Sequence, residues 1–127
     1  MYKITKRMEI SSSHILDLPY KSPCQNEHGH NWIITIEITH HLLDCSGMVV
    51  DFSHIEDVVN RLDHTCLNRV IGFSKGTNPT AENIAAWVCR NVQSKISELW
   101  EPTGYSSPTV SKVTVQESEG NEACYIP

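Results

Sequence analysis

The stretch that decides the fold spans residues 28–39 and reads HGHNWIITIEIT. From residue 32 onward apolar side chains occupy every second position, at Trp32, Ile34, Ile36 and Ile38. A period of two is that of a half-buried β-strand. The first ten residues alternate in the same way, with an apolar face made of Tyr2, Ile4, Met8 and Ile10. Both stretches are predicted to be strands that pair as an antiparallel hairpin, joined by a long polar loop.

Two helical patterns follow the predicted hairpin. Ser53 and Glu56, three residues apart, have the form of a capping box, which predicts a helix with Ser53 at its N-cap. The apolar face of this helix consists of Ile55, Val58, Val59 and Leu62. Residues 78–83, Asn-Pro-Thr-Ala-Glu-Asn, open a second and longer helix, with Pro79 in its first turn. Its apolar stripe consists of Ile84, Val88, Val92, Ile96 and Leu99.

The C-terminal part of the sequence predicts two further strands. After a breaker-rich loop at residues 101–108, the stretch Val110–Glu117 alternates as a third strand, and Ala123–Ile126 forms a fourth beyond a turn at residues 119–121. The order ββααββ predicts one α+β domain over residues 1–127, with two helices packed on one face of a four-stranded antiparallel sheet. The open edges of such a sheet favour pairing with other copies of the chain.

Composition excludes several classes of function. The net charge is -5, and no run of Lys or Arg marks a surface for nucleic acid or anionic membranes. No apolar run approaches the roughly 18 residues of a membrane helix, and the N-terminus lacks the apolar core of a signal peptide. A cytoplasmic location is therefore expected. The five cysteines are odd in number and scattered, which predicts free thiols.

Three histidines are placed to share a metal ion. His28 and His30 flank Gly29, and in extended chain the side chains of residues i and i+2 project to the same face. An antiparallel hairpin that pairs residues near 14 with residues near 29 brings His14, just past the first predicted strand, beside them. Three neutral imidazoles with one open position form the layout of a catalytic zinc site.

Two other arrangements of these side chains stay open at this point. Cys24 lies four residues before His28 and is a possible fourth ligand, which would make the site a closed structural one. His40 and His41 form a rival pair. Because they are adjacent, their rings face opposite sides of a strand, and we interpret them as its solvated end.

Further residues have the chemistry for proton transfer and heterocycle binding. Asp63 and His64 follow the first helix, and a carboxylate beside an imidazole fixes its tautomer and raises its basicity. Such a pair is also common as an ordinary surface cap. A thiol near a dication, such as Cys24 here, is more easily deprotonated. Glu117 extends an apolar strand face, where a carboxylate suits paired N–H donors of a planar heterocycle.

Several motifs resemble, in order, those of the 6-pyruvoyl/6-carboxy-tetrahydropterin synthase family. Residues 24–30 resemble its Cys-x-x-x-His-Gly-His signature, residues 62–68 its Leu-Asp-His-x-x-Leu-Asn motif, and residues 78–83 its Asn-Pro-Thr-x-Glu-Asn helix start. The resemblance extends through Ser11–His14, Gly47–Phe52, Glu117, Ala123 and Tyr125. Ile10 departs from the Phe that is frequent in the family, which affects packing rather than chemistry.

The resemblance implies a T-fold that assembles into rings, commonly hexamers, with active sites between subunits. It implies zinc on His14, His28 and His30, and 7,8-dihydroneopterin triphosphate as the substrate. By the family's mechanism, zinc acidifies hydroxyls of the substrate's side chain, and triphosphate is eliminated. Protons are moved by Cys24, Asp63 and His64, while Glu117 anchors the amino edge of the pterin and Thr80 contacts it. No motif identifies the cation that receives the triphosphate; the candidates are Lys21, Arg69 and Lys75.

Two products are compatible with the resemblance. The residues within the motifs favour the 6-carboxy branch. This branch releases the side chain as acetaldehyde and serves the synthesis of queuosine and other deazapurines. The alternative is the 6-pyruvoyl branch of tetrahydrobiopterin synthesis. From other classes, a zinc-stabilised binding module would close the metal site with Cys24. A Cys-His hydrolase would use Cys24 as nucleophile and His64 as base.

Overall fold

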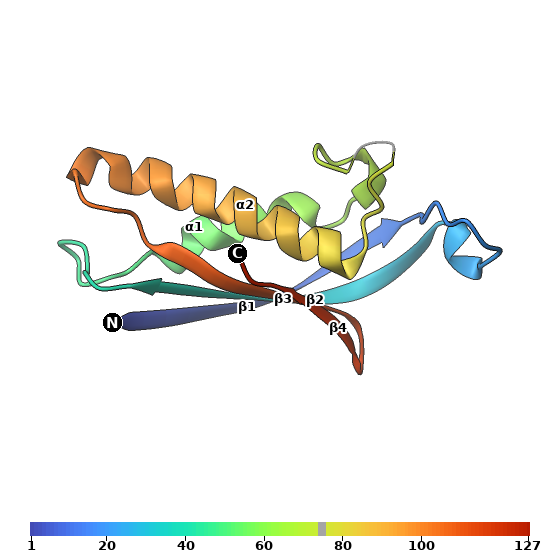
Figure 1. Cartoon of the computed structure of the whole chain (residues 1–127), viewed down its shortest axis with the longest axis horizontal. Helices are drawn as coiled ribbons and strands as arrows, with labels where there is room; N and C mark the ends of the chain where they lie inside the picture. Colours follow the sequence, from blue (N-terminus) through green and yellow to red (C-terminus); the bar gives the residue numbers. More distant parts are fainter. Residues whose placement is uncertain (74–75) are drawn as a thin grey trace.

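A single antiparallel sheet carries both helices on one of its faces (Figure 1). The computed structural model describes residues 1–73 and 76–127, so the candidate cation Lys75 lies outside the described residues. The strands, in the spatial order β1-β2-β3-β4, are β1 (Tyr2–His14), β2 (His28–His40), β3 (Thr109–Ser118) and β4 (Asn121–Tyr125). The helices are α1 (Phe52–Val59) and α2 (Ala81–Trp100). The predicted α+β class and ββααββ order are confirmed.

The β1–β2 hairpin is longer than the apolar alternation indicated. Its ladder runs from Tyr2 opposite His40 to His14 opposite His28, so His14 ends β1 instead of following it. The serine-rich end stays extended because both of its edges are hydrogen-bonded. On the side away from β2, the backbone N–H of Ser13 donates to Thr65 O at 3.0 Å, and the N–H of His64 donates to Ser11 O at 2.7 Å.

The core lies between the sheet and the helices. Even-numbered side chains of β1 and β2 face the helices, so Ile10, Trp32 and Ile34 are almost fully buried together with Ile36 and Ile38. Helix α2 packs its buried residues over this face, and β3 adds Val113 and Val115. Burying each such side chain contributes roughly 1.5–3 kcal/mol, which makes this face the main source of stability.

Helix α1 begins two residues earlier than the capping-box pattern predicted. Asp51 is its N-cap, with extended backbone and a carboxylate that accepts the N–H of Ser53 at 2.9 Å. The prediction of Ser53 as N-cap is therefore wrong. Glu56, the other half of the predicted box, forms an ion pair with Lys6 of β1 instead. A capping-box pattern spans only a few residues, so it cannot indicate a partner 50 residues away in the sequence.

Helix α2 also differs from its prediction at both ends. Thr80 is the N-cap and its hydroxyl accepts the N–H of Asn83 at 3.3 Å, so Pro79 precedes the helix and is not in its first turn. At the other end Leu99 is exposed, and Trp100 takes the buried position of the last turn.

The far ends of the strands bring two further corrections. His40, predicted to be solvated, is only 8% exposed, because its ring lies edge-on against Trp100 with centroids 4.8 Å apart. His41 is exposed as predicted. Strand β4 begins at Asn121 and ends at Tyr125, since the turn from β3 closes within two residues and Gly120 adopts φ 80°. Among the described residues no helix has the length and apolar character needed to cross a membrane.

Exchanging Asp51 for Ala tests the observed cap against the predicted one. We expect Asp51→Ala to lower the urea midpoint of unfolding by a few tenths molar, because an N–H of the first turn loses its acceptor. The hydrogen bond from Ser53 lowers the pKa of Asp51 in the folded state. The cap's contribution is thus complete above the ordinary carboxyl pKa of about 3.9 and disappears as pH falls through the depressed value.

The matched control is Ser53→Ala, which leaves the carboxylate cap in place and should lower the midpoint less. If Ser53→Ala lowered the urea midpoint more than Asp51→Ala does, Ser53 and not Asp51 would be the N-cap.

Candidate active site

His14, His28 and His30 meet at the polar end of the helix-facing side of the sheet. The ladder places His14 opposite His28 and Ser12 opposite His30, and all three imidazoles lie on the same side as the core residues of these strands. Their ligand nitrogens lie within 4.8 Å of one another. The convergence predicted from the hairpin is confirmed, and this group can hold a metal ion.

Hydrogen bonds prepare two of these rings for a metal. Nδ1 of His14 lies 2.7 Å from Pro79 O, and Nδ1 of His28 lies 2.7 Å from Asn26 O. Carbonyl oxygens only accept, so both Nδ1 atoms donate, and each Nε2 presents a lone pair. The two Nε2 atoms face each other at 2.9 Å. Their lone pairs repel each other at this distance, and a cation bound by both nitrogens would remove the repulsion. Backbone acceptors behind the ligands are typical of histidine metal sites.

Burial favours the neutral form of the imidazoles that a metal requires. His14 is fully buried, and this burial, more than the neighbouring His28, lowers its pKa against the opposing effect of the Pro79 hydrogen bond. Burial likewise lowers the pKa of His30, whose Nε2 is buried without a hydrogen-bond partner among the residues that the structure describes. Trp32 packs edge-on against both rings, with centroids 5.0 Å from His14 and 5.1 Å from His30. The donor set and its surroundings fit zinc.

Glu117 adjoins the histidine group from β3. Its Oε1 lies 3.4 Å from Nε2 of His14 and 3.3 Å from Nε2 of His30. Glu117 also lines a cavity of about 310 Å³ together with Thr80 and Glu82, which begin α2. We call this the α2 cavity. The structure thus brings two predicted residues, Glu117 and Thr80, to one cavity beside the histidines.

Glu82 is a residue that the sequence reasoning missed. It is exposed, lies in the first turn of α2 and adds a second carboxylate to the α2 cavity. The available signal was its place in the Asn-Pro-Thr-Ala-Glu-Asn motif, two residues after Thr80. An acidic residue in the first turn of a helix is normally explained by the helix dipole, which hides any second role.

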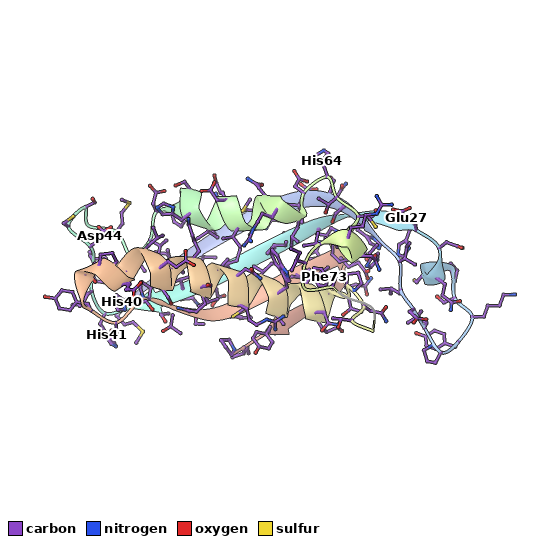
Figure 2. All side chains as sticks on the ribbon, turned by 90° about the horizontal axis from the view of Figure 1, so that it is seen from above. Glu27, His40, His41, Asp44, His64 and Phe73 are labelled. Carbon is purple, nitrogen blue, oxygen red and sulfur yellow. The ribbon has the colours of Figure 1, made fainter. Side chains whose placement is uncertain are left out.

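The predicted Asp63–His64 pair is formed, although a 3₁₀ turn, Asn60–Leu62, separates it from α1. Oδ2 of Asp63 lies 2.9 Å from Nδ1 of His64, and Oδ1 accepts the backbone N–H of Ser11 at 2.8 Å. The Ser11 bond is the main reason that the pKa of Asp63 is lowered. His64 has φ 54°, and its side chain is 83% exposed. Figure 2 shows it projecting from the edge of the molecule.

A second and larger cavity, of about 560 Å³, lies where the serine-rich end of β1 meets the segment after α1. We call it the β1-edge cavity. It is lined by His30, one of the three converging histidines, and by His64 of the Asp-His pair. Glu27, Cys66 and Arg69 line it as well. One residue of each predicted set, His30 and His64, therefore borders this cavity.

Cys24 lies in a 3₁₀ turn, Pro23–Gln25, and is partly buried. Within the described part of the chain, the group whose ligand atoms converge consists of the three histidines, and Cys24 is outside it. This favours an open metal site over one closed by sulfur.

Comparison with known proteins agrees with the geometry. The family model for 6-pyruvoyl tetrahydropterin synthase matches residues 3–127. A 6-carboxy-5,6,7,8-tetrahydropterin synthase of Bacillus subtilis is 31% identical over 130 residues, covering 99% of this chain and 86% of its own. One from Rickettsia felis is 30% identical, covering 76% of this chain and 83% of its own.

Solved structures show the same fold. The 6-pyruvoyl tetrahydropterin synthase of Caenorhabditis elegans superposes with a TM-score of 0.76 at 25% identity, over 99% of this chain and 95% of that one. The Plasmodium vivax enzyme of the same name, at 17% identity, gives a TM-score of 0.62 over 98% of both chains. With a family match over nearly its whole length and a T-fold around three converging histidines, this chain belongs to the 6-pyruvoyl tetrahydropterin synthase family.

Proposed function

We propose that this chain, as one tetrahydropterin synthase domain, converts 7,8-dihydroneopterin triphosphate to 6-carboxy-5,6,7,8-tetrahydropterin, releasing triphosphate and acetaldehyde. The observation that carries the proposal is the three-histidine group with Glu117 beside it, in a chain of this family. The names of the Bacillus and Rickettsia relatives support the 6-carboxy product. The reaction would serve the synthesis of queuosine and other deazapurines.

The metal in this proposal is zinc, held by His14, His28 and His30. Bound there, zinc would supply Lewis acidity to the hydroxyl groups of the substrate's side chain. The protein's own contribution is to keep the imidazoles neutral and oriented. Pro79 O and Asn26 O fix the tautomers of His14 and His28, and Trp32 excludes water from beneath the rings.

The α2 cavity is the proposed pterin site. The Glu117 carboxylate accepts two parallel N–H bonds from the amino edge of the heterocycle, an arrangement that is stronger and more directional than a single neutral bond. Thr80 and Glu82 line the same cavity and contact the ring from the start of α2. The proximity of Glu117 to His30 supports a pterin whose side chain reaches the three histidines.

Proton transfer falls to Cys24, Asp63 and His64. Because Asp63 accepts the Nδ1–H of His64, the exposed Nε2 is the atom that exchanges protons. Cys24 acts as a second base or acid in the reaction. His64 projects from the β1 edge, which suits an active site shared between copies in a ring-shaped homo-oligomer, such as a hexamer.

The alternative product is 6-pyruvoyl-tetrahydropterin. The family's name and the likeness to the Caenorhabditis elegans enzyme favour this candidate. Both reactions eliminate triphosphate, and they differ in whether the carbon side chain is retained.

Product analysis decides between the two reactions. On incubation of the zinc-loaded protein with 7,8-dihydroneopterin triphosphate, we expect 6-carboxy-tetrahydropterin by mass spectrometry and acetaldehyde in equal amount. A pterin that keeps its three-carbon side chain, without acetaldehyde, would establish the 6-pyruvoyl reaction instead. Absence of triphosphate release would reject both.

Replacing His28 by Ala should remove zinc and activity together. His28 is partly exposed and outside the hydrophobic core, so we expect a folded protein with less than a tenth of the wild-type zinc content by elemental mass spectrometry. The control is His41→Ala, an exposed histidine on the opposite end of the sheet, which should retain full zinc (Figure 2). Full activity in a zinc-free His28→Ala protein would contradict the assignment.

Replacing Cys24 by Ala separates a proton carrier from a ligand. We expect zinc to be retained and turnover to fall at least about 100-fold, the scale of acid–base catalysis. Cys45→Ala, which removes an exposed thiol, should change neither quantity. If zinc leaves together with the Cys24 thiol, the site is the closed four-ligand one.

A further inference from the structure

The loop that carries Cys24 lies outside the sheet. It consists of residues 15–27, joins β1 to β2, and is called the Cys24 loop below. Figure 1 shows it, in blue, extending past the ends of both strands. A group that transfers protons has to be held within hydrogen-bond reach of the atom it serves, so the bonds that fix this loop bear on the chemistry of the thiol.

The turn around Cys24 is tied to the first residues of the same loop. The backbone N–H of Leu16 donates to Cys24 O at 3.0 Å. The side-chain amide of Gln25 donates to Leu18 O at 3.1 Å. The position of the thiol therefore follows the position of residues 16–18.

Two asparagine side chains bind the residues on either side of Leu16. The carboxamide of Asn68 donates to Ile15 O and accepts the N–H of Ile15, both at 2.8 Å. The carboxamide of Asn78 makes the same pair of bonds with Asp17, again at 2.8 Å each. A carboxamide presents a donor and an acceptor in one plane, so each pair fixes both the distance and the orientation of the loop backbone.

Asn68 is itself held by the core and by β1. It lies in the 3₁₀ turn Leu67–Arg69, and Leu67 is fully buried. The turn is closed by the N–H of Arg69, which donates to Cys66 O at 3.0 Å, and Cys66 forms a parallel bridge with Ser13. The first pair of bonds therefore attaches the Cys24 loop to the hydrophobic core.

Asn78 is held by the start of α2. Its backbone oxygen accepts the side-chain amide of Asn83 and the N–H of Thr80, each at 2.8 Å. The next residue, Pro79, is the one whose carbonyl accepts Nδ1–H of His14. One short segment thus orients the His14 ring through a carbonyl and the Cys24 loop through a side chain.

We propose that Asn68 and Asn78 are positioning residues that hold the Cys24 thiol in place for proton transfer. Both act through the backbone of residues 15–18, to which the turn around Cys24 is bonded. The catalytic part of this inference rests on the proposed function, whereas the anchoring of the loop follows from the hydrogen bonds alone. The two parts are tested by separate measurements.

Anchoring is measured by hydrogen exchange and by thiol reactivity. In Asn78→Ala we expect the peptide containing residues 15–25 to exchange its amide hydrogens about tenfold faster, the order expected for the loss of one or two hydrogen bonds. Cys24, which is partly buried, should react with iodoacetamide faster by a similar factor, relative to the exposed Cys45 of the same chain. Asn68→Ala should produce both changes, while peptides from α2 keep their protection and report an intact fold.

A double-mutant cycle tests whether Asn78 acts through Cys24. Turnover per bound zinc should fall about tenfold when Asn78→Ala is made in the wild type, the effect expected of a lost pair of hydrogen bonds. In a Cys24→Ala background the same change should cost less than about twofold, because the thiol that Asn78 positions is gone. Equal losses in both backgrounds would overturn the positioning role, since they would show that Asn78 supports activity by a route independent of Cys24.

Asn91→Ala is the matched control. Its side-chain amide donates to Trp87 O at 2.8 Å within α2, so the change removes the same kind of bond away from the loop. Exchange of residues 15–25 and reactivity of Cys24 should keep their wild-type values. Unchanged exchange and alkylation in both Asn68→Ala and Asn78→Ala would overturn the anchoring, whatever the activity. If the loop loosens but Cys24→Ala keeps full turnover, the proposed role of Cys24 fails, and the positioning role fails with it.

Discussion

The register of the β1–β2 hairpin is the constraint on which the rest of the structure depends. It places every even-numbered side chain of both strands toward the helices, so the apolar core and the three imidazoles share one surface. A slip of one residue would turn both His14 and Ile10 to the opposite face. The hydrophobic burial of Trp32, Ile34 and Ile36 therefore stabilises the same pairing that brings the three histidines together. Fold and site are not independent features of this chain.

Burying imidazoles at the end of a hydrophobic face has a cost, which the start of α2 offsets. A polar ring taken out of water needs a partner, and His14 finds one in Pro79 O. Because Pro79 precedes the helix, its carbonyl can turn toward the sheet, and Thr80 caps the first turn. The same few residues thus terminate a loop, begin a helix, orient the His14 ring and border the α2 cavity.

Charged side chains line both cavities near the histidines. Carboxylates from Glu117 and Glu82 line the α2 cavity, where N–H donors of a heterocycle are expected, while a guanidinium borders the β1-edge cavity. Asp63 contributes differently: the backbone N–H of Ser11 keeps it ionised, and this fixes the tautomer of His64.

The sequence by itself determined the order of the elements, the hairpin and the three converging histidines. These follow from short-range rules: the period of two in a strand, the common face of residues i and i+2, and motifs a few residues long. Only the tertiary structure decided that Asp51 caps α1, that His40 is buried against Trp100, and that Glu82 and Arg69 border the cavities. Each of these depends on partners distant in the sequence. Glu56 pairs with Lys6 of β1 instead of capping its own helix. The turn that carries Arg69 is held at the end of β1 because Asn68 binds Ile15, 53 residues away along the chain. Local sequence patterns do not predict such contacts, because the contacts form only when packing brings separate segments together.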